Sequence, residues 1–166
     1  MKPAQNIFIL SRPVQSGKTS TLMHWCSGRS DVSGFLTPDV GGKRKLFDLE
    51  SKAYHELEVS EYDASSIAVG KFLFDKNVFA HGRELIRKAI ENPPAWFVID
   101  EVGPLEIRHR SGFEPALSEM ISHCKSKAQT KLLLVVRDHM LAEFLHRYDL
   151  QNASVNDPQL MSAGEH

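Results

Sequence analysis

The stretch "NIFILSRPVQSGKTSTLMHWC", residues 6–26, decides the fold class of this 166-residue chain. It opens with the apolar run 6–10, which is short and continuous, as in a strand that is covered on both faces. It closes with residues 18–26, which predict a helix. Between these two elements lies a loop that ends in Gly17-Lys18-Thr19. A strand, a loop with this tripeptide and a helix are the context in which phosphate-binding loops occur.

The loop matches the phosphate-binding pattern G-x-x-x-x-G-K-[ST] except at its first position, where Arg12 stands in place of glycine. That glycine mainly permits a tight turn where the chain leaves the strand. Pro13 favours an extended conformation for Arg12, which suits the end of a strand. We therefore expect the loop to keep its phosphate contacts, made by Val14, Gln15, Ser16, Gly17, Lys18, Thr19 and Ser20.

These residue types suit a bound polyphosphate. The backbone N–H groups of the loop and of the first helical turn converge on an anion. Gly17 lets the backbone come close to it, Lys18 neutralises the β- and γ-phosphates, and the Thr19 hydroxyl is a ligand for Mg²⁺. The side chain of Arg12 is expected to be solvated, with a nucleotide contact as the alternative.

The rest of the chain alternates further strands with helices, which indicates a mostly parallel sheet with right-handed crossovers, an α/β fold. Further buried strands are predicted at 34–40, 96–100 and 131–136. Apolar residues at helical spacing predict helices at 76–91, 113–125 and 139–148, each with its apolar stripe in the core. Residues 42–75 break this rhythm with short alternating segments, which predict an antiparallel hairpin or two at the edge of the sheet.

The composition restricts the class of protein further. The length suits a single domain, predicted at 1–156, followed by a loosely held C-terminal tail at 157–166. A net charge of −1 provides no general attraction to nucleic acid. No apolar run approaches the roughly 20 residues of a membrane helix, and the N-terminus lacks a signal-peptide pattern, so the cytoplasm is expected. Cys26 and Cys124 are predicted to be core residues. The oligomeric state is left open.

A second motif, "AWFVIDEVGPLEI" at 95–107, supplies acidic residues. Asp100 ends a predicted buried strand, and parallel sheets bind ligands at that edge. We expect Asp100 to hold Mg²⁺ and Glu101 to polarise an attacking water. His109 lies a few residues beyond and is expected to be a surface histidine.

Six segments of the chain together resemble the small nucleoside-triphosphatase family, whose members occur in thermophilic bacteria, archaea and humans. They are "GKT", "GFLTPDV", "GKRKLFDL", "VGKFLFD", "VIDEVGPLE" and "GFEPAL". The resemblance covers roughly residues 6–140. Its most specific part is the run Asp100-Glu101-Val102-Gly103 with a second acid at Glu106. The chain departs from the family at Arg12 and Leu46, where glycine is usual, and in its short region after 150.

The resemblance implies a three-layer RecA-like P-loop fold and slow Mg²⁺-dependent hydrolysis of ATP, GTP and other nucleoside triphosphates. It also implies that Gly17, Lys18 and Thr19 bind phosphate, that Asp100 and Thr19 hold Mg²⁺, and that Glu101 is the catalytic base. Arg44 follows the hairpin turn, and it is interpreted either as an arginine finger or as a solvated hairpin charge. Arg137 has a weaker claim to the same role.

Two other functions remain open at this point. A P-loop kinase would pass the γ-phosphoryl group to a small molecule and would need an acceptor site and a lid, for which 108–117 is the available segment. A nucleotide-binding module with negligible turnover would be compatible with Arg12 and Leu46. Glu101 speaks against the binding module, because a pure binder needs no acid to orient water.

Overall fold

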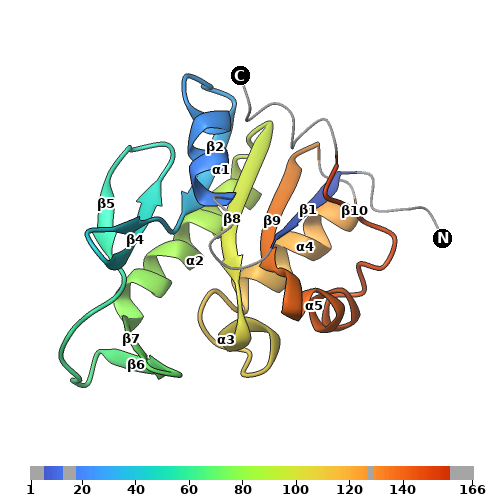
Figure 1. Cartoon of the computed structure of the whole chain (residues 1–166). Helices are drawn as coiled ribbons and strands as arrows, with labels where there is room; N and C mark the ends of the chain where they lie inside the picture. The colour runs from blue at the N-terminus through green and yellow to red at the C-terminus, as the bar shows by residue number, and fades with distance from the viewer. Residues whose placement is uncertain (1–5, 13–17, 127–128, 158–166) are drawn as a thin grey trace.

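The computed structural model describes residues 6–12, 18–126 and 129–157 (Figure 1). Its strands are β1 (Ile7–Arg12), β2 (Val32–Leu36), β3 (Asp39–Val40), β4 (Lys43–Asp48), β5 (Tyr54–Glu56), β6 (Ser66–Val69), β7 (Phe72–Asp75), β8 (Trp96–Val102), β9 (Lys131–Arg137) and β10 (Ser154–Val155). Its α-helices are α1 (Lys18–Cys26), α2 (Lys76–Glu91), α3 (Pro104–Ile107), α4 (Ala116–Ser126) and α5 (Leu141–Arg147), with a 3₁₀ turn, η1 (Asp138–Met140), before α5.

The main sheet has eight strands in the order β10-β1-β9-β8-β2-β4-β3, with β5 paired to β4. The strands from β10 to β2 run parallel, and β4 is antiparallel to β2. This is the predicted parallel sheet with an antiparallel hairpin at its edge. The strand β9 lies between β1, which precedes the predicted phosphate-binding loop, and β8, which carries the acidic motif. This spacing is central to the geometry of the site.

Helices cover both faces of the sheet, so the fold has three layers (Figure 1). On one face, α1 packs Leu22 and Trp25 against Val98 of β8 and its neighbours. On the other face, α2, α4 and α5 pack against a larger cluster that includes Phe97 and Ile99. Successive residues of β8 thus face opposite layers, as the alternation of a strand requires. The apolar stripes predicted for the helices lie in this core or pack against it, as expected.

Helix α2 has the predicted bounds for local reasons. Asp75 caps its N-terminus by accepting a hydrogen bond of 2.8 Å from the backbone N–H of Asn77. The helix ends just before the Pro93-Pro94 pair. The predicted helix 113–125 instead begins at Ala116, because Pro115 disfavours a helical conformation for Glu114.

Three other details differ from the sequence-based prediction. The run 34–40 divides into β2 and β3, with Thr37 and Pro38 between them. Of the two predicted hairpins, β4–β5 lies at the sheet edge, whereas β6–β7 forms a separate two-stranded sheet. The short strand β10 pairs in parallel with β1 and was not predicted, because two residues carry no periodic signal. Residues 158–166 of the predicted tail lie outside the described part of the chain.

Both cysteines are buried and free, as predicted. Burial raises the pKa of each thiol to about 11, so both remain protonated and unreactive at neutral pH. Across the described ranges, no helix is both long and apolar enough to cross a membrane.

Candidate active site at the carboxyl edge of the sheet

The carboxyl ends of three parallel strands form the site. Strand β1 ends at Arg12, β9 ends at Arg137, and β8 carries Asp100 and Glu101 near its end. Arg12 is the register partner of Arg137 in the β1–β9 pair, so Arg12 is in extended conformation, as predicted. Ligands of open α/β sheets bind at this edge.

The phosphate-binding residues are only partly described. Val14, Gln15, Ser16 and Gly17 lie outside the described residues. Helix α1 begins at Lys18, as predicted, so Lys18, Thr19 and Ser20 form its first turn. The predicted strand–loop–helix context is therefore present, and the phosphate contacts of these residues stay a prediction.

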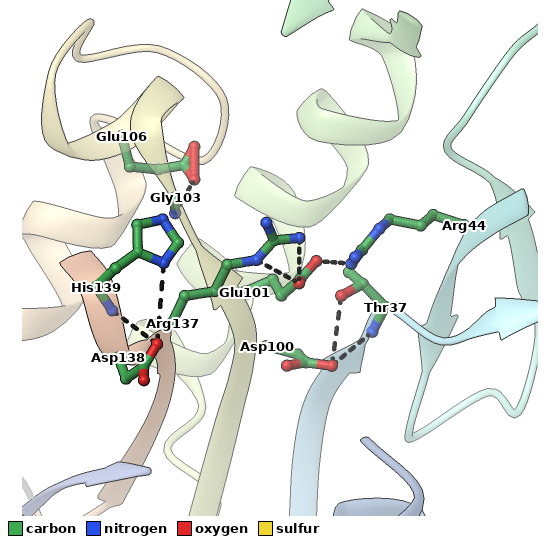
Figure 2. A network of polar contacts seen from close by, with 9 residues as sticks. All are labelled: Thr37, Arg44, Asp100, Glu101, Gly103, Glu106, Arg137, Asp138 and His139. Carbon is green, nitrogen blue, oxygen red and sulfur yellow. Dashed lines mark hydrogen bonds and ion pairs between the residues drawn. The ribbon is translucent and has the colours of Figure 1, made fainter. Parts of the chain in front are cut away.

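Asp100 lies fully buried in the sheet, with an exposed fraction of 0%. Its Oδ2 atom accepts hydrogen bonds from the backbone N–H of Thr37, at 3.0 Å, and from the Thr37 hydroxyl, at 3.3 Å (Figure 2). Thr37 follows β2, the neighbouring strand, and sequence analysis did not single it out. These two bonds fix the orientation of the Asp100 carboxylate at the edge of the sheet.

A β-bulge near the end of β8 sets the direction of Glu101. The register of β8 with β9 shifts between Ile99 and Val102, and Glu101 has a φ of 56°, in the left-handed region. Successive side chains of a regular strand point to opposite faces. Bulges re-aim side chains and are frequent beside active sites. Here the bulge lets two consecutive acids, Asp100 and Glu101, serve the same end of the sheet.

Two arginines hold the Glu101 carboxylate (Figure 2). The Arg44 guanidinium forms an ion pair with Oε2 of Glu101. The Arg137 guanidinium donates to Oε1, at 3.1 Å from Nη2 and 3.3 Å from Nε. Burial and the nearby Arg137 lower the pKa of Arg44 from its ordinary value. Two cations thus share one anion, and the cluster carries a net positive charge.

The β3–β4 turn brings Arg44 to the site. Gly41 and Gly42 form this turn with φ values of 64° and 86°, a conformation that glycine adopts without strain. Strand β4 then starts with Lys43, and Arg44 is its second residue. The structure places the Arg44 side chain against Glu101 and not in solvent. This excludes the solvated hairpin charge, and the arginine-finger role stays a prediction. Arg137 is at the same carboxylate.

Leu46, the second departure from the family pattern, has a structural role. Its side chain is fully buried in the larger core cluster. His109 is exposed, as predicted.

The acidic and hydroxyl oxygens at this edge fit Mg²⁺, which prefers hard oxygen ligands. Among the described residues no group of three His, Cys, Asp or Glu side chains is placed to hold a metal by itself. Mg²⁺ in nucleotide sites is typically bound by one or two protein ligands together with phosphates and water. The buried carboxylate of Asp100 is suited to that arrangement, and Thr19 stays a predicted second ligand.

Glu106, the second acid of the motif, lies in α3 and is buried. It is 2% exposed, and its Oε1 accepts a hydrogen bond of 3.1 Å from the Gly103 N–H at the start of α3 (Figure 2). Within the described residues, no donor pairs with its Oε2. Burial is the main cause that raises the pKa of Glu106 to about 8. Glu106 is therefore predominantly neutral at pH 7.

We expect Glu106→Gln to remove a pH dependence of stability. Below about pH 4.5 the glutamate is protonated in both states; between pH 4.5 and 8 only the unfolded state releases the proton. The wild type therefore loses stability as the pH rises through this window, by up to about 5 kcal/mol relative to Glu106→Gln. Urea unfolding of both proteins from pH 5 to 9 measures the difference. Glu119→Gln, an exposed site, is the control; parallel curves for Glu106→Gln and wild type would contradict the assignment.

The comparisons with known proteins agree with this fold. The model of the NTPase family matches residues 6–157, so the chain belongs to that family. The chain is similar to the solution structure of a human cancer-related nucleoside triphosphatase, with 20% identity over 97% of this chain and 94% of the other and a TM-score of 0.62. It is also similar to the crystal structure of THEP1 from the hyperthermophile Aquifex aeolicus, with 14% identity, 90% and 87% coverage and a TM-score of 0.60. No curated protein sequence matches the chain.

The family resemblance inferred from the sequence is thereby confirmed, and the fold is a three-layer α/β fold of the RecA-like P-loop type. At these identities the two solved structures establish the fold alone.

Proposed function

We propose that the protein is a Mg²⁺-dependent nucleoside-triphosphatase that slowly hydrolyses ATP, GTP and related triphosphates to the diphosphate and phosphate. The observation that carries the proposal is the cluster of Glu101, Arg44 and Arg137 beside the buried Asp100. This cluster lies at the carboxyl end of β8, with one strand between it and the strand of the phosphate-binding loop.

The residues that follow β1 bind the phosphates, and Asp100 of β8 contributes to the binding of Mg²⁺. The loop from Val14 to Gly17 and the first turn of α1 bind the phosphates, and Lys18 neutralises the β- and γ-phosphates. Thr19 and Asp100 would hold Mg²⁺, which supplies positive charge to the β- and γ-phosphate oxygens. Thr37 keeps Asp100 in place for that contact.

The contacts of Glu101 with Arg44 and Arg137 belong to a resting state, before a nucleotide binds. Both Glu101 carboxylate oxygens are engaged by guanidinium groups, which lowers the basicity of the carboxylate toward a water molecule. A γ-phosphate carries more negative charge than a carboxylate and competes for Arg44 and Arg137. When the arginines turn to the phosphate, Glu101 is released to orient water.

The reaction then follows from these positions. The water oxygen forms a bond to the γ-phosphorus, the bond to the β–γ bridging oxygen breaks, and Glu101 accepts the proton from water. Arg44 and Arg137 stabilise the charge that develops on the γ-phosphoryl group and its leaving oxygen.

Phosphate release tests the proposal. The purified protein is expected to release phosphate from ATP, GTP, CTP or UTP in the presence of Mg²⁺ and to stop when EDTA removes the metal. Lys18→Ala is expected to weaken nucleotide binding, whereas Lys76→Ala, an exposed lysine of α2, is expected to behave as wild type. Nucleotide binding without phosphate release would contradict the proposal and favour the kinase or the binding module.

The proposal places the protein in the cytoplasm, with nucleotides as its partners. The two free, buried cysteines are consistent with a reducing compartment.

A further inference from the structure

A cavity of about 600 Å³ opens directly beside Glu101. Its apolar lining comes mainly from the segment before the β6–β7 hairpin, the hairpin itself, α2 and the region around α3, with Met140 of η1 as a further part. The main apolar residues are Leu57, Phe72, Phe74, Phe79, Leu105 and Phe113. Figure 1 shows the β6–β7 hairpin and α3 at the end of the sheet where β8 finishes. This volume is within the range of small-molecule sites, about 300–1,000 Å³.

Hydrolysis does not account for a cavity of this kind. Glu101, Arg44 and Arg137 form one part of the lining, and a water molecule and a phosphoryl group need only that part. The remainder is mostly aromatic and aliphatic. An exposed aromatic side chain, Phe72, belongs to this lining.

The nucleoside of the substrate does not explain the cavity either. Under the proposed function the γ-phosphate faces Glu101, and the nucleoside is at the opposite end of the triphosphate. Among the described residues, no lining residue comes from β1, α1 or β10. The described lining therefore continues from Glu101 toward the β6–β7 hairpin and α3, and not toward β1 and α1.

The charged residues of the lining favour an anion. Lys71, in the β6–β7 turn, and Arg108 and His109, at the end of α3, join the two arginines of the site. Arg108 is paired with Glu143, whereas Lys71 has no ion pair within the described part of the chain and lies over the Phe72 ring, 5.4 Å from its centroid. The two acids in the lining do not balance these charges, because Arg44 and Arg137 neutralise Glu101 and burial keeps Glu106 mostly protonated at pH 7.

We propose that this cavity binds a second small molecule, one with a flat apolar body and an anionic group, next to the reacting phosphate. The aromatic side chains of the hairpin and of α2 contact the body, and Lys71 and the end of α3 contact the anionic group. The inference rests on the proposed function only for the placement of the nucleotide; the binding site itself does not depend on hydrolysis.

The fluorescent probe 8-anilinonaphthalene-1-sulfonate has this chemistry, and its uncharged counterpart N-phenyl-1-naphthylamine is a matched comparison. Val69→Trp places a large side chain in the cavity and is expected to weaken the binding of both probes by about tenfold or more. Leu73 lies on the same hairpin between Phe72 and Phe74 but does not line the cavity, so Leu73→Trp is expected to bind both probes as wild type does.

Charge reversal tests the anion separately. Lys71 is exposed, so Lys71→Glu is expected to fold normally even if Val69→Trp does not. It is expected to weaken binding of the sulfonate by about fivefold or more, because an attractive lysine–sulfonate contact becomes a repulsive one. Binding of the uncharged probe is expected to stay unaffected. Lys76→Glu, the same change at an exposed lysine outside the lining, is the control. Equal affinities in Lys71→Glu and Lys76→Glu would overturn the anionic part of the proposal.

Competition with nucleotide separates this inference from the proposed function. The sulfonate is expected to bind equally well when a non-hydrolysable ATP analogue and Mg²⁺ saturate the protein. Displacement of the probe by the analogue would overturn the proposal and assign the cavity to the nucleotide itself. Absence of probe binding to the wild type would also overturn it. Probe binding with the expected variant pattern in a protein that releases no phosphate would instead contradict the hydrolase and leave the second site standing.

Discussion

Replacing Glu101 by Gln is expected to lower kcat by about 10²–10⁴-fold, the usual contribution of a positioned general base. The Gln side chain has the same shape and still offers an oxygen to a guanidinium group. It lacks the charge and the basicity that draw a proton from water. Nucleotide affinity should change little, because the proposed function assigns the phosphate contacts to the loop and α1. Single-turnover phosphate release gives the rate, and titration with a fluorescent nucleotide gives the affinity.

A matched control separates the loss of a base from the loss of an ion pair. Glu143 pairs with Arg108, with a shortest distance of 2.6 Å, and it lies outside the site cluster. Glu143→Gln removes a glutamate–arginine pair without touching Glu101 and should hydrolyse as wild type does. Hydrolysis by Glu101→Gln at the wild-type rate would show that another group orients the water.

Replacing Arg44 by Ala is expected to lower kcat by about 10³-fold, the lower end of the range for an arginine finger. The Arg44 side chain is already at the Glu101 carboxylate, which the proposed function places beside the γ-phosphate, and burial has removed part of its solvation. Arg44→Lys should recover little, because a lysine ammonium cannot make the planar two-point contact that a guanidinium group can make with a phosphate. Rates at saturating nucleotide for the three proteins measure the effect.

The sign of this effect distinguishes two roles. If the arginines only restrain Glu101, removing Arg44 frees the base, and hydrolysis becomes faster. If Arg44 stabilises charge on the γ-phosphoryl group, hydrolysis becomes slower, as we expect. Arg87→Ala removes an exposed arginine that pairs with Glu119 and serves as the control. A faster Arg44→Ala enzyme would contradict the finger role.

Much of the fold followed from local sequence signals. The strand–loop–helix unit and helix α2 each carry a strong periodic or apolar pattern with a clear start and end, and both were found where predicted. Short elements were missed for the opposite reason. Strand β10 and helix α3 are too brief to repeat a period, and β10 forms only because β1 offers it a partner far away in the sequence.

The site also has features with a local sequence signal and features that depend on distant parts of the chain. The acidic pair at Asp100 and Glu101 could be predicted, because both acids directly follow the apolar run 96–99. Arg44 and Arg137 were candidates for the site, but their pairing with Glu101, and that of Thr37 with Asp100, could not be predicted. Thr37 is 63 residues from Asp100 and Arg137 is 36 residues from Glu101, and nothing local links them. The bulge that turns Glu101 toward the site depends on the pairing of β8 with β9, which no single segment encodes.

The position of β9 affects how the protein would distinguish nucleoside triphosphates from diphosphates. It pairs along its length with β1 and β8, and its residues from 132 to 136 are essentially inaccessible to solvent. Two strand spacings, about 10 Å, therefore separate the loop strand from the acidic strand. Such a buried strand acts as a ruler of fixed length. A triphosphate held at α1 would span it and meet the arginines, whereas a diphosphate would stop short. The fixed distance between the two strands would thus select the triphosphate substrate over the diphosphate product by the length of the phosphate chain.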